Sequence, residues 1–188
     1  MQLNLSTYLT ILRLILTPFL IIFFYIPFRW SPIVCSLLFT TAALTDLFDG
    51  FFARLLKQKT KFGSFLDPVA DKIIVNITLV LITEYYSIWW MTIPTIIIIS
   101  REIFISALRE WIATELNKKN IISVSYIGKS KTTFQMISLI GLLWHPNNII
   151  EKISIALLYF STILAFLSML QYTFSGIKYT KNKIKYLK

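Results

Sequence analysis

The sequence has few charged residues, and acidic residues are the scarcest. Only 15% of its residues are charged, whereas an average soluble domain carries about 25%. Nine residues are acidic against 19 basic ones, hydrophobic residues make up 56% of the chain, and the mean hydropathy is +0.68. This composition excludes an ordinary soluble domain. It predicts one membrane-embedded domain covering residues 1–188.

Cysteine and histidine are nearly absent as well. Cys35 is the single cysteine, so the chain cannot form an internal disulfide, and its apolar neighbours predict a small buried side chain. His145 is the single histidine and lies in a turn-like His-Pro-Asn-Asn segment, where we expect no catalytic role. The candidates for chemistry are therefore the carboxylates and the basic side chains.

Six apolar segments are candidates for membrane-crossing helices, which need about 20 residues each. They are Leu9–Phe28, Pro32–Phe52, Val69–Tyr86, Ile88–Leu108, Thr132–Trp144 and Ile153–Phe174. The fifth is short and could begin near Ile127. Residues 1–8, where Asn4, Ser6 and Thr7 could cap a helix, are expected to lie along the membrane interface. We therefore predict an all-α, polytopic integral membrane protein with six transmembrane helices.

Basic residues are concentrated on one side of this predicted topology. The three groups are Arg54, Lys57, Lys59, Lys61 and Lys72; Arg109, Lys118, Lys119, Lys129 and Lys131; and Lys178, Lys181, Lys183, Lys185 and Lys188. The opposite side has only Arg29 and Lys152, and Arg13 and Arg101 lie within spans. Positive residues favour the cytoplasmic side, so both termini should be cytoplasmic. The basic tail, residues 176–188, should touch anionic lipids rather than nucleic acid.

All four aspartates fall in one stretch, at the predicted cytoplasmic boundary between the second and third spans. Asp46 and Asp49 are three residues apart, and Asp67 and Asp71 are four apart, so each pair occupies one face of its helix. The two helices are adjacent and antiparallel, which lets the pairs converge. Four clustered carboxylates repel one another unless a cation binds them. They supply the hard oxygen ligands that suit Mg²⁺ or Mn²⁺, with room for two ions.

Small residues and an arginine accompany the aspartates. Gly50 and Ala53 would let a ring or a phosphate approach the helix backbone, and Arg54 can bind phosphate in a bidentate manner. Gly63 can relieve crowding before the third span, and Pro68 is expected in the first turn of that span. Each feature alone has a structural explanation, such as a helix cap or a packing contact. Helix capping and packing do not explain the whole set within 26 residues of a chain so poor in acids.

Written from Asp46 to Asp71, the motif is Asp-x2-Asp-Gly-x2-Ala-Arg-x8-Gly-x3-Asp-x3-Asp. It resembles, at every position, the signature of the CDP-alcohol phosphotransferase family, whose members are six-span membrane enzymes. The resemblance implies that Asp46, Asp49 and Asp67 bind one divalent ion, and that Asp46, Asp67 and Asp71 bind a second. Asp71 is also implied as the general base. The remaining implied contacts, to the nucleotide of a CDP-linked lipid, are Gly50, Ala53, Arg54, Thr60, Gly63, Asn4 and Thr7.

Three flanking runs resemble the bacterial phosphatidylglycerophosphate synthase branch of that family. They are Asn4 to Arg13, Ser100 to Trp111 and Ser125 to Thr133. This resemblance implies CDP-diacylglycerol and glycerol 3-phosphate as substrates, membrane lipids as surroundings, a homodimer, and the bacterial inner membrane as location.

The charges of the chain also suit an anionic acceptor. Arg101 and Glu102 lie inside an apolar span, where charges usually line a pocket, and Arg109 lies about 12 Å further along a helix. With Lys129 and Lys131 they could bind the acceptor phosphate. Arg101 could instead pair with a carboxylate on a neighbouring helix, the two lysines could contact lipid headgroups, and Glu102 and Glu110 could simply hold the arginines.

The resemblance, with charges that suit an anionic acceptor, therefore implies transfer of a phosphatidyl group from CDP-diacylglycerol to glycerol 3-phosphate, giving phosphatidylglycerophosphate and CMP. Two alternatives stay open. One is a sibling enzyme that uses serine, inositol phosphate or phosphatidylglycerol as acceptor. The other is a divalent-cation transporter, although the far side offers only Glu84 and Glu151 as acids for a conduction path.

Overall fold

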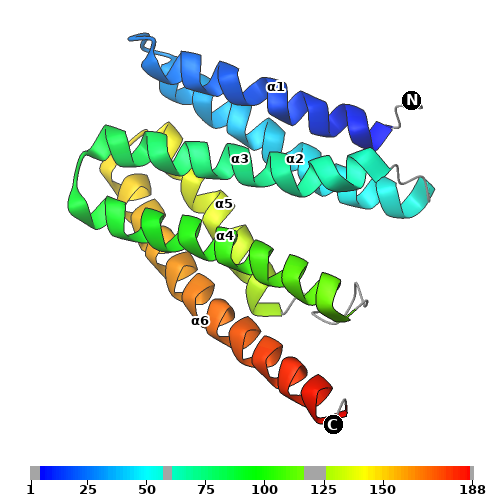
Figure 1. The fold of residues 1–188 in the computed structure, drawn as a ribbon. Coiled ribbons are helices and arrows are strands. Elements are labelled where there is room, and N and C mark those ends of the chain that lie inside the picture. Colours follow the sequence, from blue (N-terminus) through cyan, green and yellow to red (C-terminus); the bar gives the residue numbers. More distant parts are fainter. Residues whose placement is uncertain (1–4, 57–60, 117–125, 187–188) are drawn as a thin grey trace.

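The computed structural model describes residues 5–56, 61–116 and 126–186. These residues form six helices and no strand (Figure 1). The helices are α1 (Leu5–Tyr25), α2 (Ser31–Leu56), α3 (Lys61–Tyr86), α4 (Trp89–Leu116), α5 (Tyr126–Trp144) and α6 (Asn148–Tyr186). The prediction of an all-helical protein is confirmed.

The helices run back and forth, and the two chain ends lie on the same side of the bundle (Figure 1). One group consists of α1 packed on α2 and α3, and a second consists of α6 packed on α4 and α5. Contacts of α2 with α5, and of α3 with α4 and α5, join the two groups. The aspartate-bearing helices α2 and α3 therefore meet the helices that carry the predicted acceptor residues, α4 and α5.

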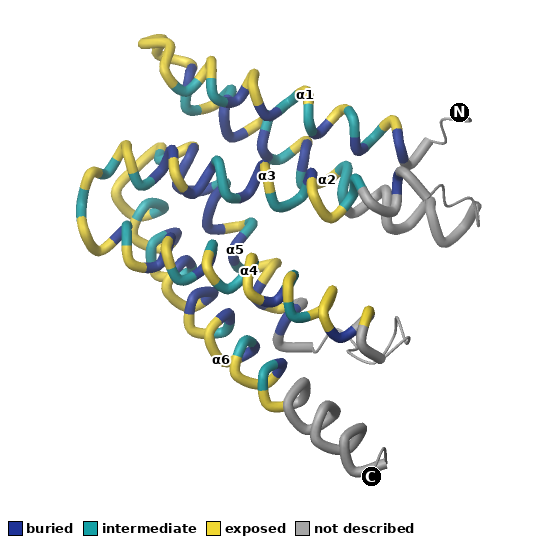
Figure 2. Tube along the Cα trace, in the orientation of Figure 1, coloured by how far each residue is buried: buried dark blue, intermediate teal, exposed yellow. Residues whose placement is uncertain are grey.

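Three of the described helices are long and apolar enough to cross a membrane by length and composition. Their spans are Thr7–Tyr25, Trp89–Ile112 and Asn148–Phe174. In α2 the uninterrupted apolar part, Ser31–Asp46, is shorter. Many large apolar residues are exposed, such as Phe19 at 48%, Ile103 at 63% and Phe174 at 69%, and Figure 2 shows exposed positions recurring along the helices. Such an apolar exterior fits a lipid environment, because a soluble protein rarely exposes apolar patches of this extent.

Several helix ends differ from the predicted spans. Helix α1 ends at Tyr25 rather than Phe28, because Ile26 precedes a proline and is disfavoured in helical conformation. Helix α3 begins at Lys61 rather than Val69, so Pro68 lies inside the helix and not in its first turn. Hydropathy marks the part of a helix that suits lipid, and α3 extends beyond that part.

Other boundaries refine the prediction at both chain ends and in the fifth span. Residues 5–8 are the first turn of α1, while the interfacial location predicted for residues 1–8 stays a prediction. Helix α5 begins at Tyr126, next to the suggested Ile127. Helix α6 continues to Tyr186 over 39 residues. At 1.5 Å per residue this is about 58 Å, well beyond the roughly 30 Å of hydrocarbon. Most of the basic tail is therefore a helical extension.

The core is apolar and centred on side chains from all six described helices. Its most buried members include Leu20, Cys35, Phe39, Leu79, Ile98, Leu139 and Leu158. The predicted burial of Cys35 is confirmed at 1% exposure. Helices α5 and α6 approach closely at Gly141, where an added Cβ would lie 3.1 Å from the Cβ of Ser154. The Ser138 hydroxyl donates to the Ser154 carbonyl at 2.7 Å across the same crossing.

Candidate active site

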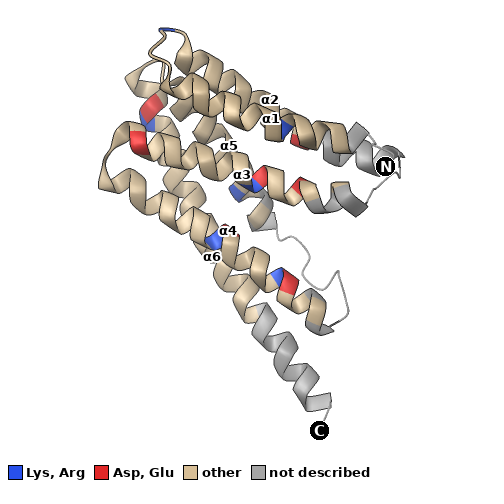
Figure 3. Ribbon diagram, turned by 45° about the horizontal axis from the view of Figure 1, so that its top comes forward, with Lys and Arg blue, Asp and Glu red and all other residues tan. Residues whose placement is uncertain are grey.

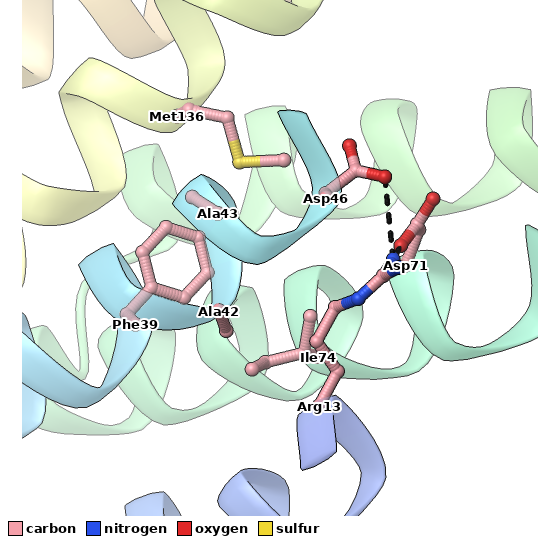
Figure 4. A pocket seen from close by; sticks show the side chains of 8 residues that line it. All are labelled: Arg13, Phe39, Ala42, Ala43, Asp46, Asp71, Ile74 and Met136. Atoms are coloured by element: carbon pink, nitrogen blue, oxygen red, sulfur yellow. Dashed lines mark hydrogen bonds and ion pairs between the residues drawn. The ribbon is translucent and has the colours of Figure 1, made fainter. Parts of the chain in front are cut away.

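Aspartates from α2 and α3 converge on an arginine from α1. Arg13 Nη1 donates to Asp46 Oδ1 at 3.2 Å and also to Asp71 Oδ1. In Figure 4 the end of the Arg13 side chain reaches the Asp71 carboxylate, and a dashed line joins it to Asp46. The Arg13 side chain is 1% exposed, whereas those of Asp46 and Asp71 are 42% and 34% exposed. Carboxylates from two helices therefore meet at one positive group. The predicted convergence of this pair is confirmed, and its role in binding metal ions stays a prediction.

Asp67 lies one helical turn before Asp71 and also contacts α1. The Thr10 hydroxyl donates to Asp67 Oδ1, and Thr10 and Arg13 are three residues apart on α1. This spacing puts both α1 side chains on one helix face. Helix α1 thus forms one wall of the carboxylate site.

A cavity of about 540 Å³ opens between α3, α4 and α5 and reaches the carboxylates. Its charged lining includes Asp46, Asp71, Lys72, Arg101, Glu102, Arg109, Glu110 and Lys131. Figure 3 shows acidic and basic positions on neighbouring helices of the bundle. A volume in this range holds a small organic ligand. The structure therefore brings three of the four predicted acceptor residues next to two of the predicted metal ligands.

The basic residues of the cavity are held by polar partners. Arg101 Nη2 donates to Ser168 Oγ at 2.8 Å rather than pairing with a carboxylate, and its buried Nε has no hydrogen-bond partner among the described residues. Arg109 lies 5.3 Å above the ring centre of Tyr172, in cation–π range. Both arginines are thereby fixed by α6.

Lys131 makes a different contact. Its ammonium group forms an ion pair with Glu102 at 2.8 Å, and the side chains of Lys131 and Glu102 are 1% and 13% exposed. Glu102 therefore holds a lysine rather than an arginine. Lys72, next to Asp71, donates to the Ser106 hydroxyl on α4.

Several predicted site residues have no described side chain. These are Asp49, Gly50, Ala53, Arg54, Thr60, Asn4 and Lys129, of which Thr60 and Asn4 lie outside the described residues altogether. Of the other nucleotide candidates, Gly63 is buried near the start of α3 and Thr7 is 2% exposed on α1. Within the described part of the chain, no three acidic, histidine or cysteine side chains lie together as metal ligands. The convergence of Asp46 and Asp71 on a cationic nitrogen nevertheless fits a cation site, because hard oxygen ligands from two helices already meet there.

Sequence reasoning assigned no site role to Arg13, Thr10 or Lys72. A signal for Arg13 was present, because an arginine within an apolar span is rare and usually has a function. The hydroxyl of Thr10 carried no such signal. Lys72 was counted only among the basic residues that orient the chain.

Comparisons with known proteins identify similar chains. The family model described as CDP-alcohol phosphatidyltransferase matches residues 3–171. Three similar proteins carry the name CDP-diacylglycerol–glycerol-3-phosphate 3-phosphatidyltransferase. The one from Yersinia enterocolitica is 56% identical over 92% of this chain and 94% of its own, and that from Sodalis glossinidius is 53% identical over 94% and 96%. The Pectobacterium atrosepticum protein is 55% identical over 92% and 94%.

Proposed function

The chain belongs to the CDP-alcohol phosphatidyltransferase family, and on that premise we propose that it joins CDP-diacylglycerol to glycerol 3-phosphate. The products are phosphatidylglycerophosphate and CMP. The names of its relatives support this reaction. The single observation that carries the proposal is the cavity of about 540 Å³, where Asp46 and Asp71 from α2 and α3 share a lining with three predicted acceptor residues of α4 and α5, namely Arg101, Arg109 and Lys131.

The two sides of the cavity suit the two parts of the reaction. Arg101, Arg109 and Lys131 line its basic side, with Lys129 close by in sequence. Arginine and lysine are the usual partners of phosphate, and the unpaired Nε of Arg101 leaves one buried donor for it. We assign the phosphate of glycerol 3-phosphate to this side.

The carboxylate side would hold two divalent cations, which members of this family generally require. Asp46, Asp49, Asp67 and Asp71 would bind them as Mg²⁺ or Mn²⁺. When bound, the cations would neutralise the diphosphate of the CDP-lipid. Gly50, Ala53, Arg54, Thr60, Gly63, Asn4 and Thr7 are the proposed contacts to its nucleotide part.

Asp71 is the proposed general base. It lines the cavity together with the basic residues, so an acceptor anchored by its phosphate can present its primary hydroxyl there. Asp71 takes the hydroxyl proton as the oxygen attacks the phosphorus on the lipid side of the diphosphate. The bond from that phosphorus to the bridging oxygen breaks, and CMP leaves with the electron pair.

The proposed location of the site, at the membrane surface, suits a substrate that has both acyl chains and a water-soluble nucleotide. The acyl chains of CDP-diacylglycerol stay in the bilayer, while its nucleotide and the soluble acceptor meet at the membrane surface. The surplus of basic residues on the side of the termini supports a cytoplasmic position for that surface. The proposed location is the bacterial inner membrane, with both termini and the site on the cytoplasmic side, and the proposed assembly is a homodimer.

An acceptor assay tests the function. Purified protein is incubated with labelled CDP-diacylglycerol and Mg²⁺, and CMP release is measured with glycerol 3-phosphate, serine, inositol phosphate or phosphatidylglycerol. We expect release with glycerol 3-phosphate and a labelled phosphatidylglycerophosphate product. Faster turnover with any other acceptor would assign the chain to a different branch of the family.

A further inference from the structure

Helix α1 contributes a buried arginine to the carboxylate site, and the reaction described above does not use it. Arg13 contacts Asp46 on α2 and Asp71 on α3 through the same nitrogen, Nη1. The arginine is 1% exposed while the two aspartates are about a third or more exposed. The positive charge thus lies behind the carboxylates, away from the opening through which a substrate would enter.

Apolar side chains lie beside Arg13 on one side. A void of about 10 Å³ beside it has walls that include Phe39, Ala42 and Ile74 (Figure 4). Such a void has room for about one water molecule. In apolar surroundings a charge interacts strongly with its partner, and a charge without one is costly. Arg13 and the carboxylates therefore depend on one another.

We propose that Arg13 is the resident counter-cation of the carboxylate site. Its charge offsets the repulsion between Asp46 and Asp71 and holds both in place before divalent cations bind. Close carboxylates would otherwise resist sharing a site while both are ionised. The inference rests on the proposed function, because it takes these aspartates as cation ligands. Arg13 is in this account a positioning residue and not a catalytic one.

A counter-cation and an ordinary structural arginine differ in one measurable respect. If Arg13 offsets carboxylate charge, bound Mg²⁺ can replace that effect, so the loss caused by Arg13→Gln must depend on Mg²⁺. Thermal unfolding of the full-length protein in detergent is measured in EDTA and in saturating Mg²⁺. We expect Arg13→Gln to lower the melting temperature in EDTA by on the order of 5 °C more than in Mg²⁺.

Arg101→Gln is the matched control. Arg101 is also an arginine facing the cavity, but its hydrogen bond goes to the Ser168 hydroxyl at 2.8 Å. Its removal should lower the melting temperature equally in EDTA and in Mg²⁺. If Arg13→Gln lowers the melting temperature equally in EDTA and in Mg²⁺, the inference about Arg13 is wrong, while the proposed function is unaffected. If the melting temperature of the wild-type protein is the same in EDTA and in Mg²⁺, the proposed cation site is wrong, and so is the inference.

A double variant keeps the test decisive if Arg13→Gln does not fold. Replacing Asp46 by Asn in the same chain removes one carboxylate that Arg13 offsets. Arg13→Gln/Asp46→Asn should therefore be more stable in EDTA than Arg13→Gln, a non-additive result that marks direct coupling. Losses that simply add, or a double variant that also fails to fold, would contradict the proposal.

Discussion

Among single residues, Asp71 has the most demanding part in the proposed reaction. It is the implied base, lines the cavity and contacts Arg13. Asp71→Asn keeps the size of the side chain but cannot accept the proton. Loss of a general base costs typically 10²–10⁴-fold in rate, and we expect CMP release to fall by roughly that factor.

The measurement is CMP release at saturating glycerol 3-phosphate, with His145→Asn as the control. His145 lies in the far turn, in a left-handed conformation with φ 28° that asparagine tolerates. Its variant should keep wild-type activity. Near-normal turnover in Asp71→Asn would remove this residue from the catalytic role.

The buried Lys131–Glu102 pair gives a second test at this scale. Lys131→Ala should raise the KM for glycerol 3-phosphate by roughly tenfold, the worth of one charged hydrogen bond. It should also destabilise the protein, because Glu102 is left buried without its partner.

The double variant Lys131→Met/Glu102→Gln separates these two effects. It removes the stranded charge, so the melting temperature should recover. The KM should stay high, because the phosphate partner is still missing. If the KM and the melting temperature both return to wild-type values in the double variant, Lys131 has only a structural role.

At the scale of helices, the crossing of α5 and α6 depends on one glycine. A Cβ at position 141 would press on Ser154, 3.1 Å from its Cβ, which is tighter than an ordinary contact and forces the helices apart. Gly141→Ala should destabilise the protein by about 1–3 kcal/mol, as overpacking does. Thermal unfolding in detergent measures the loss.

Ser154→Gly is the compensating change for this crossing. It removes the side chain that the new methyl group would meet, so Gly141→Ala/Ser154→Gly should be more stable than Gly141→Ala alone. If the stability losses of the two single variants simply add in the double variant, the contact between residues 141 and 154 does not determine how closely α5 and α6 pack.

The helices themselves were largely predictable from sequence, because apolar runs of about 20 residues report on lipid burial. The start of α3 was not, since Lys61 to Pro68 contains two charged residues, a glycine and a proline, which interrupt the apolar run and normally mark a boundary. For the site, the spacing of the aspartates predicted that Asp46 and Asp71 converge. The role of Arg13 could not follow from spacing, because its partners are 33 and 58 residues away.

For the whole molecule, the asymmetry of basic residues predicts a single orientation in the membrane. A cysteine at Arg29, exposed in the turn between α1 and α2, should react with a membrane-impermeant maleimide added to spheroplasts. A cysteine at Lys183 should react only after the membrane is opened. Cys35, 1% exposed, should give little background. The reverse labelling pattern would show that the protein has the opposite orientation in the membrane.

The central claim concerns the carboxylates at the meeting point of α1, α2 and α3. Crystals or cryo-EM samples prepared with Mn²⁺ and a CDP-lipid would show where the cation lies. We expect manganese, identified by anomalous scattering where crystals allow, within about 2.0–2.3 Å of oxygens of Asp46, Asp67 and Asp71, with the diphosphate against it. Carboxylates turned away from a common centre, or manganese bound only elsewhere, would contradict the account.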